Sequence, residues 1–383
     1  MFNSPASITI DQNQFYLELP ATPETPEQPY STNGSRQRAW INQLCLDAFL
    51  PWLRAEIIPN ARVYPHVASL PSFWELVNGT AIIFDNTRLV LIPTLAVDGD
   101  ELRVSQEWVD IPDWVADYYL AVQVNPDDGW MKIYGYTTHQ QLKTIGVYDT
   151  FDRTYSLERE DLIQDLNVLW VTHQLNYQEV LRAEIAPLPL LPQTQAENLL
   201  ARLGNSDVKF PGLSVPFSLW GALLAHGGWR KRLYELRQGI SGQYSIQTWL
   251  QAGVSNFAQQ MGWGQREFVL APSGMRSAES ILGLSRQLII AGDTYELRIF
   301  PGGNREEHIW RFELRSTSAD ATIPIGLKLR LLTEDLQPFE NNEDIATTPV
   351  NILYLEVVLQ PGEGLVWEIE PTPEDWEREI IRF

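Results

Sequence analysis

The chain has 383 residues, of which 44% are hydrophobic, and its 49 acidic and 28 basic side chains give a formal net charge of −21. This apolar content can fill complete cores and excludes overall disorder, and the length predicts two or three domains. Because the negative field repels phosphate backbones and anionic membranes, we expect a protein partner and neither nucleic acid nor a membrane surface.

The single cysteine, Cys45, excludes an internal disulfide and a cysteine-rich metal site. Apolar side chains recur around it at roughly helical spacing over residues 40–53, which predicts a buried side chain and not a nucleophile. The N-terminal residues lack the basic and apolar regions of a secretory signal, and no apolar run approaches the roughly 20 residues that cross a bilayer. These features predict a cytoplasmic protein.

Residues 1–30 contain a polar, proline-rich stretch, for which we expect a flexible arm. Its prolines are Pro20, Pro23, Pro26 and Pro29. Residues 31–186 are predicted to form an N-terminal α+β domain. This domain begins with a helix at residues 40–55 and ends with a helical segment at residues 158–175, which reads EREDLIQDLNVLWVTHQL.

Two β-hairpins are predicted between these helices, because β-rich runs flank turn-forming residues. One turn lies at Asp85 and Asn86, and the other has the sequence NPDDG at residues 125–129. The short strands predict a small, strongly curved antiparallel sheet.

Residues 187–262 are predicted to form a proline-rich joint and a helical connector. The joint lies within APLPLLPQ, and proline resists both helix and sheet. One helix is expected to end at Gly204, a second to be interrupted at Gly227 and Gly228, and a third to cover residues 245–263. Gly204 is a favourable C-terminal cap, because glycine adopts the left-handed conformation without strain.

Residues 263–383 contain five runs in which apolar and polar side chains alternate. The runs are residues 293–301, 307–316, 323–332, 351–360 and 364–370. This alternation is typical of antiparallel strands that are covered on one face. Several such strands with short turns predict a C-terminal antiparallel β-sandwich, so the fold class expected for the whole chain is α+β.

The last residues are rich in acids. Their carboxylates are Glu363, Glu368, Glu370, Glu374, Asp375, Glu377 and Glu379. We expect outward positions on the last strand and the first turn of a C-terminal helix, which Thr372 and Pro373 would start as N-cap and first helical residue. Trp376, Ile380 and Phe383 would form the buried stripe of that helix, leaving Glu377 and Glu379 exposed.

Three stretches resemble a known group of proteins. They are YGYTTHQQLK at residues 134–143, YDTFDRTYSLEREDL at residues 148–162, and residues 339–383, which include PGEGLVWEIEPTPEDW. The chain resembles, along nearly its whole length, an uncharacterised cyanobacterial family that carries a domain of unknown function. The resemblance implies a cyanobacterial cytoplasmic protein and brings no catalytic residues with it.

No motif indicates a catalytic site, a metal or a cofactor. The histidines stand far apart in the sequence, at His66, His139, His173, His226 and His308. No serine has the G-x-S-x-G pattern of a nucleophile elbow, and no glycine-rich loop has a nucleotide-binding spacing. The acidic stretch at residues 333–344 offers oxygen ligands for calcium, but it lacks the EF-hand spacing, which favours a solvated turn.

The candidate partner-binding residues lie in HGGWRKRLYELR at residues 226–237. They are Trp229, Arg230, Lys231, Arg232, Tyr234 and Arg237. Arginine and aromatic side chains are enriched in binding hot spots, although a helix end balanced by the helix dipole has the same composition. We therefore expect a non-enzymatic interaction or regulatory protein. The alternative is a hydrolase-like enzyme whose site is formed by scattered residues at a domain interface.

Overall fold

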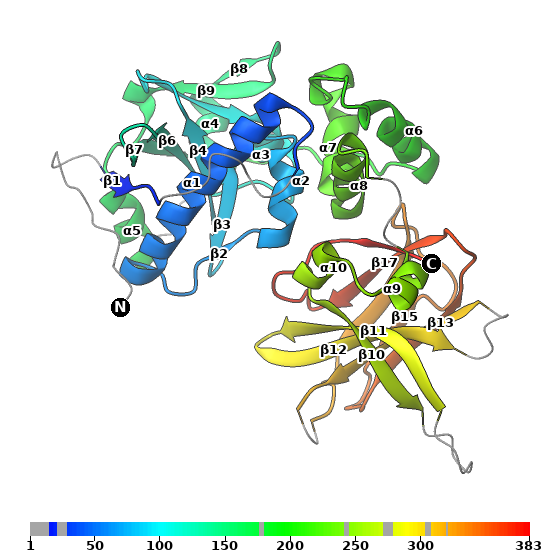
Figure 1. The fold of residues 1–383 in the computed structure, drawn as a ribbon. Coiled ribbons are helices and arrows are strands. Elements are labelled where there is room, and N and C mark those ends of the chain that lie inside the picture. The colour runs from blue at the N-terminus through cyan, green and yellow to red at the C-terminus, as the bar shows by residue number, and fades with distance from the viewer. Residues whose placement is uncertain are drawn as a thin grey trace. The chain divides into compact units, whose positions relative to one another are not determined.

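The structure is a computed structural model, and it describes residues 15–20, 29–175, 180–240, 245–270, 279–302, 308–318 and 321–383. By its internal contacts the chain divides into two compact units, each of which is described by itself. Unit 1 comprises residues 1–191 and 195–239, and unit 2 comprises residues 192–194 and 240–383. Both contain strands, and helices accompany them, which confirms the predicted α+β class (Figure 1).

Unit 1 is built on a six-stranded sheet. In spatial order its strands are β1 (Phe15–Glu18), β7 (Trp130–Thr138), β6 (Tyr118–Asn125), β4 (Thr87–Thr94), β3 (Thr80–Phe84) and β2 (Arg62–Val63). Both predicted hairpins are confirmed, as β3–β4 and β6–β7. The sheet is not wholly antiparallel as predicted, because β4 and β6 pair in parallel. A parallel pair needs a long crossover, and residues 95–117 supply it.

The long helix α1 (Asn33–Glu56) packs on this sheet through contacts with β1, β3 and β4. It confirms the predicted helix but starts earlier, because Thr32 and Ser35 form a capping box that satisfies the first backbone N–H groups. Cys45 lies on the buried face of α1 and is inaccessible to solvent, as predicted. Burial raises the pKa of its thiol, so Cys45 stays protonated and packs as a small hydrophobe.

A second, three-stranded sheet of unit 1 contains the β8–β9 hairpin. Its strands are β5 (Glu101–Ser105), β9 (Thr154–Glu158) and β8 (Val147–Asp149), in that spatial order. The neighbouring helices are α3 (Gln106–Asp110) and α4 (His139–Ile145). Figure 1 shows β8 and β9 at the upper edge of unit 1.

Only the second half of the predicted segment at residues 158–175 is α-helical, as α5 (Leu166–Gln174). A 3₁₀ turn, η2 (Arg159–Asp161), precedes it, and Ile163 then pairs with Tyr136 of β7 as an isolated bridge. The helix can start only after this bridge, where the Asp165 carboxylate accepts a hydrogen bond from the backbone N–H of Asn167.

The remaining elements of unit 1 are α-helices and 3₁₀ turns. They are η1 (Val67–Ser69), α2 (Leu70–Trp74), α6 (Gln193–Leu203), η3 (Gly212–Ser214), α7 (Phe217–Ala225) and α8 (Gly227–Arg237). Helices α7 and α8 are separated at His226, next to the predicted glycine break, and α8 packs against α2. Residues 192–194 at the start of α6 count with unit 2.

The helices of the predicted connector are divided between the two units. Those up to residue 239 group with unit 1, whereas α9 (Ile246–Ala252) and α10 (Asn256–Gln260) group with unit 2. The third predicted helix is interrupted at Gly253, whose φ of +90° ends α9. Within the predicted arm, residues 15–18 form β1 and Tyr30 is buried, while residues 1–14 and 21–28 lie outside the described residues. The four-part division of the chain stays a prediction.

Unit 2 consists of two antiparallel sheets. One contains β10 (Trp263–Leu270), β11 (Glu279–Ile290), β12 (Asp293–Gly302), β13 (Ile309–Ser316) and β16 (Leu353–Val358). The other contains β15 (Glu343–Ile345), β14 (Lys328–Thr333), β17 (Gly364–Glu370) and β18 (Ile380–Arg382). The ring of Phe383 lies 4.8 Å from that of Trp310 and 6.0 Å from that of Phe312, so side chains of both sheets share one core. This arrangement is the predicted sandwich.

The predicted C-terminal helix is wrong. Residues 372–379 form no helix, and β18 pairs with β17 instead. Asp375 has a φ of +51°, a left-handed conformation that interrupts helical geometry directly after the expected first turn. Consequently Ile381, not Ile380, enters the core, Trp376 is half-buried, and Glu379 is buried.

Candidate interaction site

The predicted basic cluster on α8 is mostly inside unit 1. Its buried members are Trp229, Arg230, Tyr234 and Arg237. Lys231 and Arg232 are half-exposed, and both lie beside the Glu235 carboxylate. As a partner-binding surface the six residues remain a prediction, but only two of them reach the surface of unit 1.

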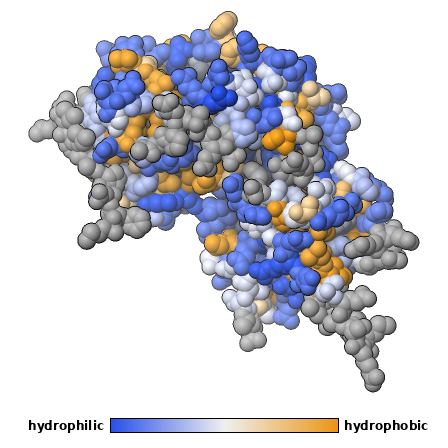
Figure 2. Space-filling model, viewed as in Figure 1, coloured by the Kyte–Doolittle hydropathy of each residue, from blue (hydrophilic) through white to orange (hydrophobic). Residues whose placement is uncertain are grey.

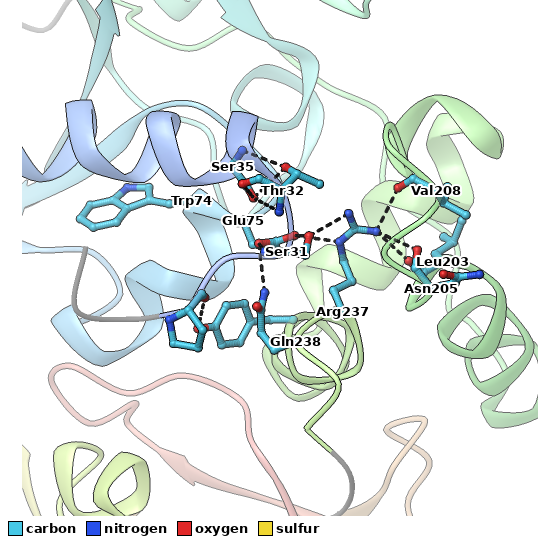
Figure 3. A network of polar contacts seen from close by, with 12 residues as sticks. Ser31, Thr32, Ser35, Trp74, Glu75, Leu203, Asn205, Val208, Arg237 and Gln238 are labelled. Atoms are coloured by element: carbon cyan, nitrogen blue, oxygen red, sulfur yellow. Dashed lines mark hydrogen bonds and ion pairs between the residues drawn. The ribbon is translucent and has the colours of Figure 1, made fainter. Parts of the chain in front are cut away.

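Arg237 is held in a network of buried polar contacts (Figure 3). Its Nε donates to Glu75 Oε1 at 2.8 Å, with the two side chains 2% and 0% exposed. Its Nη1 donates to three backbone carbonyls at 3.1–3.3 Å, those of Leu203, Asn205 and Val208. The Ser31 hydroxyl also donates to the Glu75 carboxylate. The network therefore connects α2, α8, the loop after α6 and the segment before α1.

Arg230 is held in a different way, by aromatic rings. Its guanidinium lies 3.9 Å from the ring centre of Phe73 and 5.4 Å from that of Trp114. Its Nε donates to the Ser72 hydroxyl at 3.1 Å, and its Nη1 donates to the Leu224 carbonyl at 2.9 Å. Cation–π contacts and hydrogen bonds thus stabilise the buried guanidinium of Arg230 within the fold.

The acidic stretch at residues 333–344 distributes its carboxylates among separate partners. Buried Glu334 accepts from Arg382 at 2.7 Å, and Glu343 accepts from Arg330 at 3.0 Å. Asp344 accepts from the backbone N–H of Tyr354 at 2.9 Å. Across the part of the chain that the structure describes, no group of three or more His, Cys, Asp or Glu side chains is arranged to hold a metal ion.

His139 is the most deeply buried of the five histidines. Its Nδ1 accepts from the backbone N–H of Ala183 at 3.0 Å, so its Nε2 donates to the Val109 carbonyl at 2.9 Å. Burial lowers the pKa of His139, which keeps the ring neutral. It is a structural crosslink between α4 and its neighbours.

Glu107, at the start of α3, provides a pH-dependent contribution to stability. Its Oε1 accepts from the indole Nε1 of Trp220 at 2.6 Å. Burial raises the pKa of the Glu107 carboxyl, although that hydrogen bond and the cations Arg153 and Arg38 act in the opposite direction. The folded chain therefore keeps this proton at pH values where the unfolded chain has released it, and stability falls as pH rises through that range.

We expect Glu107→Gln to stabilise the protein at pH 8 and to have a smaller effect at pH 5. The amide oxygen still accepts from Trp220, but no charge has to be desolvated. Urea unfolding of both proteins from pH 5 to 8 measures the difference in free energy, in which all other titrations cancel. A variant that loses stability relative to the parent as pH rises would show that Arg153 and Arg38 dominate over burial.

An exposed apolar surface lies on the β8–β9 hairpin. The ring of Phe151, at its tip, is 87% exposed. Val147 and Tyr148 of β8 are exposed, as is Ile145 at the end of α4. In Figure 2 the upper end of unit 1, where the hairpin lies, carries hydrophobic colour between hydrophilic atoms. We call Ile145, Val147, Tyr148 and Phe151 the hairpin surface.

Polar contacts fix the turn and the strands of this hairpin. Arg153 donates to the carbonyls of Gly212 and Val215 at 2.6 and 2.7 Å. Lys143 Nζ donates to Asp110 Oδ1 and to the Tyr155 hydroxyl, both at 2.8 Å, and that hydroxyl donates to Asp110 Oδ2 at 2.9 Å. These contacts hold the hairpin, and with it the tip, in a fixed position on unit 1.

Acidic side chains surround the tip. The side chains of Asp149 and Asp152 are 44% and 40% exposed, and Arg103 lies 4.0 and 3.0 Å from their carboxylates. Arg103 also bridges to Glu101 at 2.5 Å. The Asp149 carboxylate also accepts from the backbone N–H of Phe151 at 2.8 Å, which shapes the turn. The hairpin surface was not among the predicted site residues. Its only signal in the sequence is an aromatic residue placed between turn-forming acids, in YDTFDRTY.

Across the described residues, no helix combines the length and the apolar character that a bilayer crossing demands.

Comparison with known proteins identifies the family of the chain. No curated protein and no solved structure matches the chain. Residues 24–382 match the model of a family described as protein of unknown function (DUF1822). This match covers nearly the whole sequence, and the chain therefore belongs to that family.

Proposed function

We propose that this chain is a non-enzymatic interaction or regulatory protein that binds a partner protein through its β8–β9 hairpin. The observation that carries the proposal is the exposure of Phe151 on a braced turn. A large aromatic side chain on a preorganised support loses little conformational entropy on binding and is typical of interface hot spots. The resemblance to a cyanobacterial family and the acidic composition support action in a cyanobacterial cytoplasm.

The charges around the tip indicate the chemistry of the partner. Asp149 and Asp152 flank Phe151 in sequence, and the whole chain carries a formal charge of −21. A partner surface with an apolar pocket for the phenyl ring and basic residues around that pocket is complementary to both features. Opposite charges also accelerate encounter, so association should slow as salt is added.

We expect Phe151→Ser to abolish partner binding without changing stability. The full chain and the variant are used as baits in a lysate of the source organism, and each protein lost by the variant is purified and titrated against both baits. Removal of a hot-spot side chain typically costs 2 kcal/mol or more, which is about a 30-fold loss of affinity. Because the ring is exposed, the unfolding free energy should change by less than about 0.5 kcal/mol.

Phe210→Ser is the matched control, because Phe210 is also in unit 1 and its side chain is 69% exposed. This variant should retain the partners that Phe151→Ser loses. Equal recovery from all three baits, or equal losses from the two variants, would refute the hairpin as the binding surface.

A further inference from the structure

A cavity of about 520 Å³ lies in unit 1, away from the four residues of the hairpin surface. It is bounded by the end of β4 and the loop that follows it, and by residues of β5, β7 and β9. The Gln123 side chain holds the loop by donating to the carbonyls of Ala96 and Val97 at 3.0 and 2.7 Å. The cavity therefore has a fixed wall on the loop side.

The charges that line this cavity are predominantly negative. Four carboxylates line it, from Asp98, Asp100, Glu101 and Glu158. Its one lining cation, Arg103, is already paired with Glu101 and, outside the cavity lining, with Asp152. For Asp98, Asp100 and Glu158, the described part of the chain offers no cationic partner within ion-pair distance.

The neutral part of the lining includes apolar and aromatic side chains beside Asn78 and Thr94. Ile92, Pro93, Leu102 and Tyr134 contribute to it. Burial, reinforced by the negative charges of Glu101, Asp98 and Asp100 and opposed by Arg159, raises the pKa of Tyr134 to about 12. An alkyl stem can lie against such a wall, and an ammonium or guanidinium group is attracted both by carboxylates and by an aromatic face.

A bare metal ion fits this lining less well than an organic cation does. Calcium requires six to eight oxygen ligands at about 2.3–2.6 Å, which must converge on one point. The cavity carboxylates form no such convergent group among the residues that the structure describes. Dispersed carboxylates over an apolar wall suit a cation that carries its charge on an extended carbon chain.

We propose that this cavity binds an organic cation, namely an ammonium or guanidinium group on an apolar stem. The cation comes either from a free polyamine or from a lysine or arginine side chain of a bound protein. In both cases the stem lies against the apolar part of the cavity lining, and the cationic head is bound by the exposed carboxylates of Asp98, Asp100 and Glu158. This proposal does not depend on the hairpin surface, so it can fail or succeed independently of Phe151.

Ligand-observed NMR titration of the full chain tests the proposal with three probes at physiological ionic strength. Spermidine represents the free polyamine, and lysine capped by N-acetyl and methylamide groups represents a protein side chain. Capped norleucine has a similar stem without the charge. We expect saturable binding of at least one cationic probe and none of norleucine, and the tighter of the two cationic probes identifies the source.

Two kinds of variant localise the binding. Asp98→Asn with Asp100→Asn removes two charges, and Ala96→Phe adds a bulky side chain at the cavity lining without changing charge; each should weaken binding at least about tenfold. Asp113→Asn with Asp127→Asn is the control, since both acids are exposed in unit 1 outside the cavity, and it should bind within about twofold of the parent.

Three results would overturn the proposal. The first is the absence of saturable binding by either cation, and the second is equal binding of capped norleucine. The third is an equal loss of affinity in the cavity and control variants, which would assign the binding to the diffuse acidic surface. The unfolding free energy of every variant is measured as well, so that a loss of binding can be distinguished from a loss of folding.

Discussion

Glu379→Gln should destabilise unit 2 by about 3–5 kcal/mol, the usual cost of leaving one partner of a buried ion pair alone. Glu379 Oε1 accepts hydrogen bonds from the indole nitrogens of Trp263 and Trp367, both at 3.0 Å. It also accepts from Arg286 Nη1 at 2.9 Å, and both charged side chains are buried. The amide of glutamine would leave Arg286 without a counter-charge and place its own N–H groups among donors.

Hydrogen exchange with mass spectrometry can assign the loss of stability to peptides of unit 2, which matters because a two-unit chain does not have to unfold in one step. Glu267→Gln provides the control, as Glu267 is exposed on β10 of the same unit. If both variants exchange like the parent, the carboxylate contributes nothing to the core. The sequence suggested that Glu379 would be exposed and silent, so this experiment also tests the corrected tail.

The second large effect is expected in unit 1, where Arg237→Ala should cost about 3–5 kcal/mol. The substitution leaves the fully buried Glu75 carboxylate without its cation. It also removes the N–H groups that satisfy the carbonyls of Leu203, Asn205 and Val208. Such a loss is a large share of the 5–15 kcal/mol that typically stabilises a folded protein.

Arg232→Ala supplies the comparison for Arg237→Ala, because Arg232 lies on the same helix and its side chain is 30% exposed. We expect a change of less than about 1 kcal/mol there, because Arg232 is partly solvated and the buried Glu235 carboxylate keeps Lys231 as a second cation at 4.0 Å. The double variant Glu75→Gln with Arg237→Met should recover part of the stability, since it removes both buried charges. Similar unfolding free energies for the two arginine variants would contradict the structural role of the network.

Several strands of unit 2 could be predicted because their signal is local. Alternation of apolar and polar side chains along each run depends only on neighbours in the chain, and β12, β13, β16 and β17 follow it. Pairing is not local, however. The parallel contact of β4 with β6 has no counterpart in either strand's own pattern, because hydrogen-bond direction leaves no trace in side-chain periodicity.

The burial of charged residues could not be predicted either, because it also depends on partners that are distant in the sequence. Arg237 meets Glu75 across 162 residues of sequence, so nothing near α8 distinguishes a buried arginine from a solvated one. The exposure of the hairpin surface could not be predicted from local sequence either. Phe151 stands in a short turn among acids, where composition alone is compatible with a solvent-exposed ring or with one that folds back onto the sheet.

The Arg286–Glu379 pair has a consequence for synthesis on the ribosome. The two residues are separated by 93 positions, and translation at about 5–20 residues per second takes roughly 5–20 s to span them. Strands β10 to β13 pair with their immediate neighbours and can form a meander in that interval. Until residue 379 emerges, Arg286 and the indole of Trp263 in this nascent sheet lack their acceptor. We therefore expect chaperones to bind this nascent sheet during that interval.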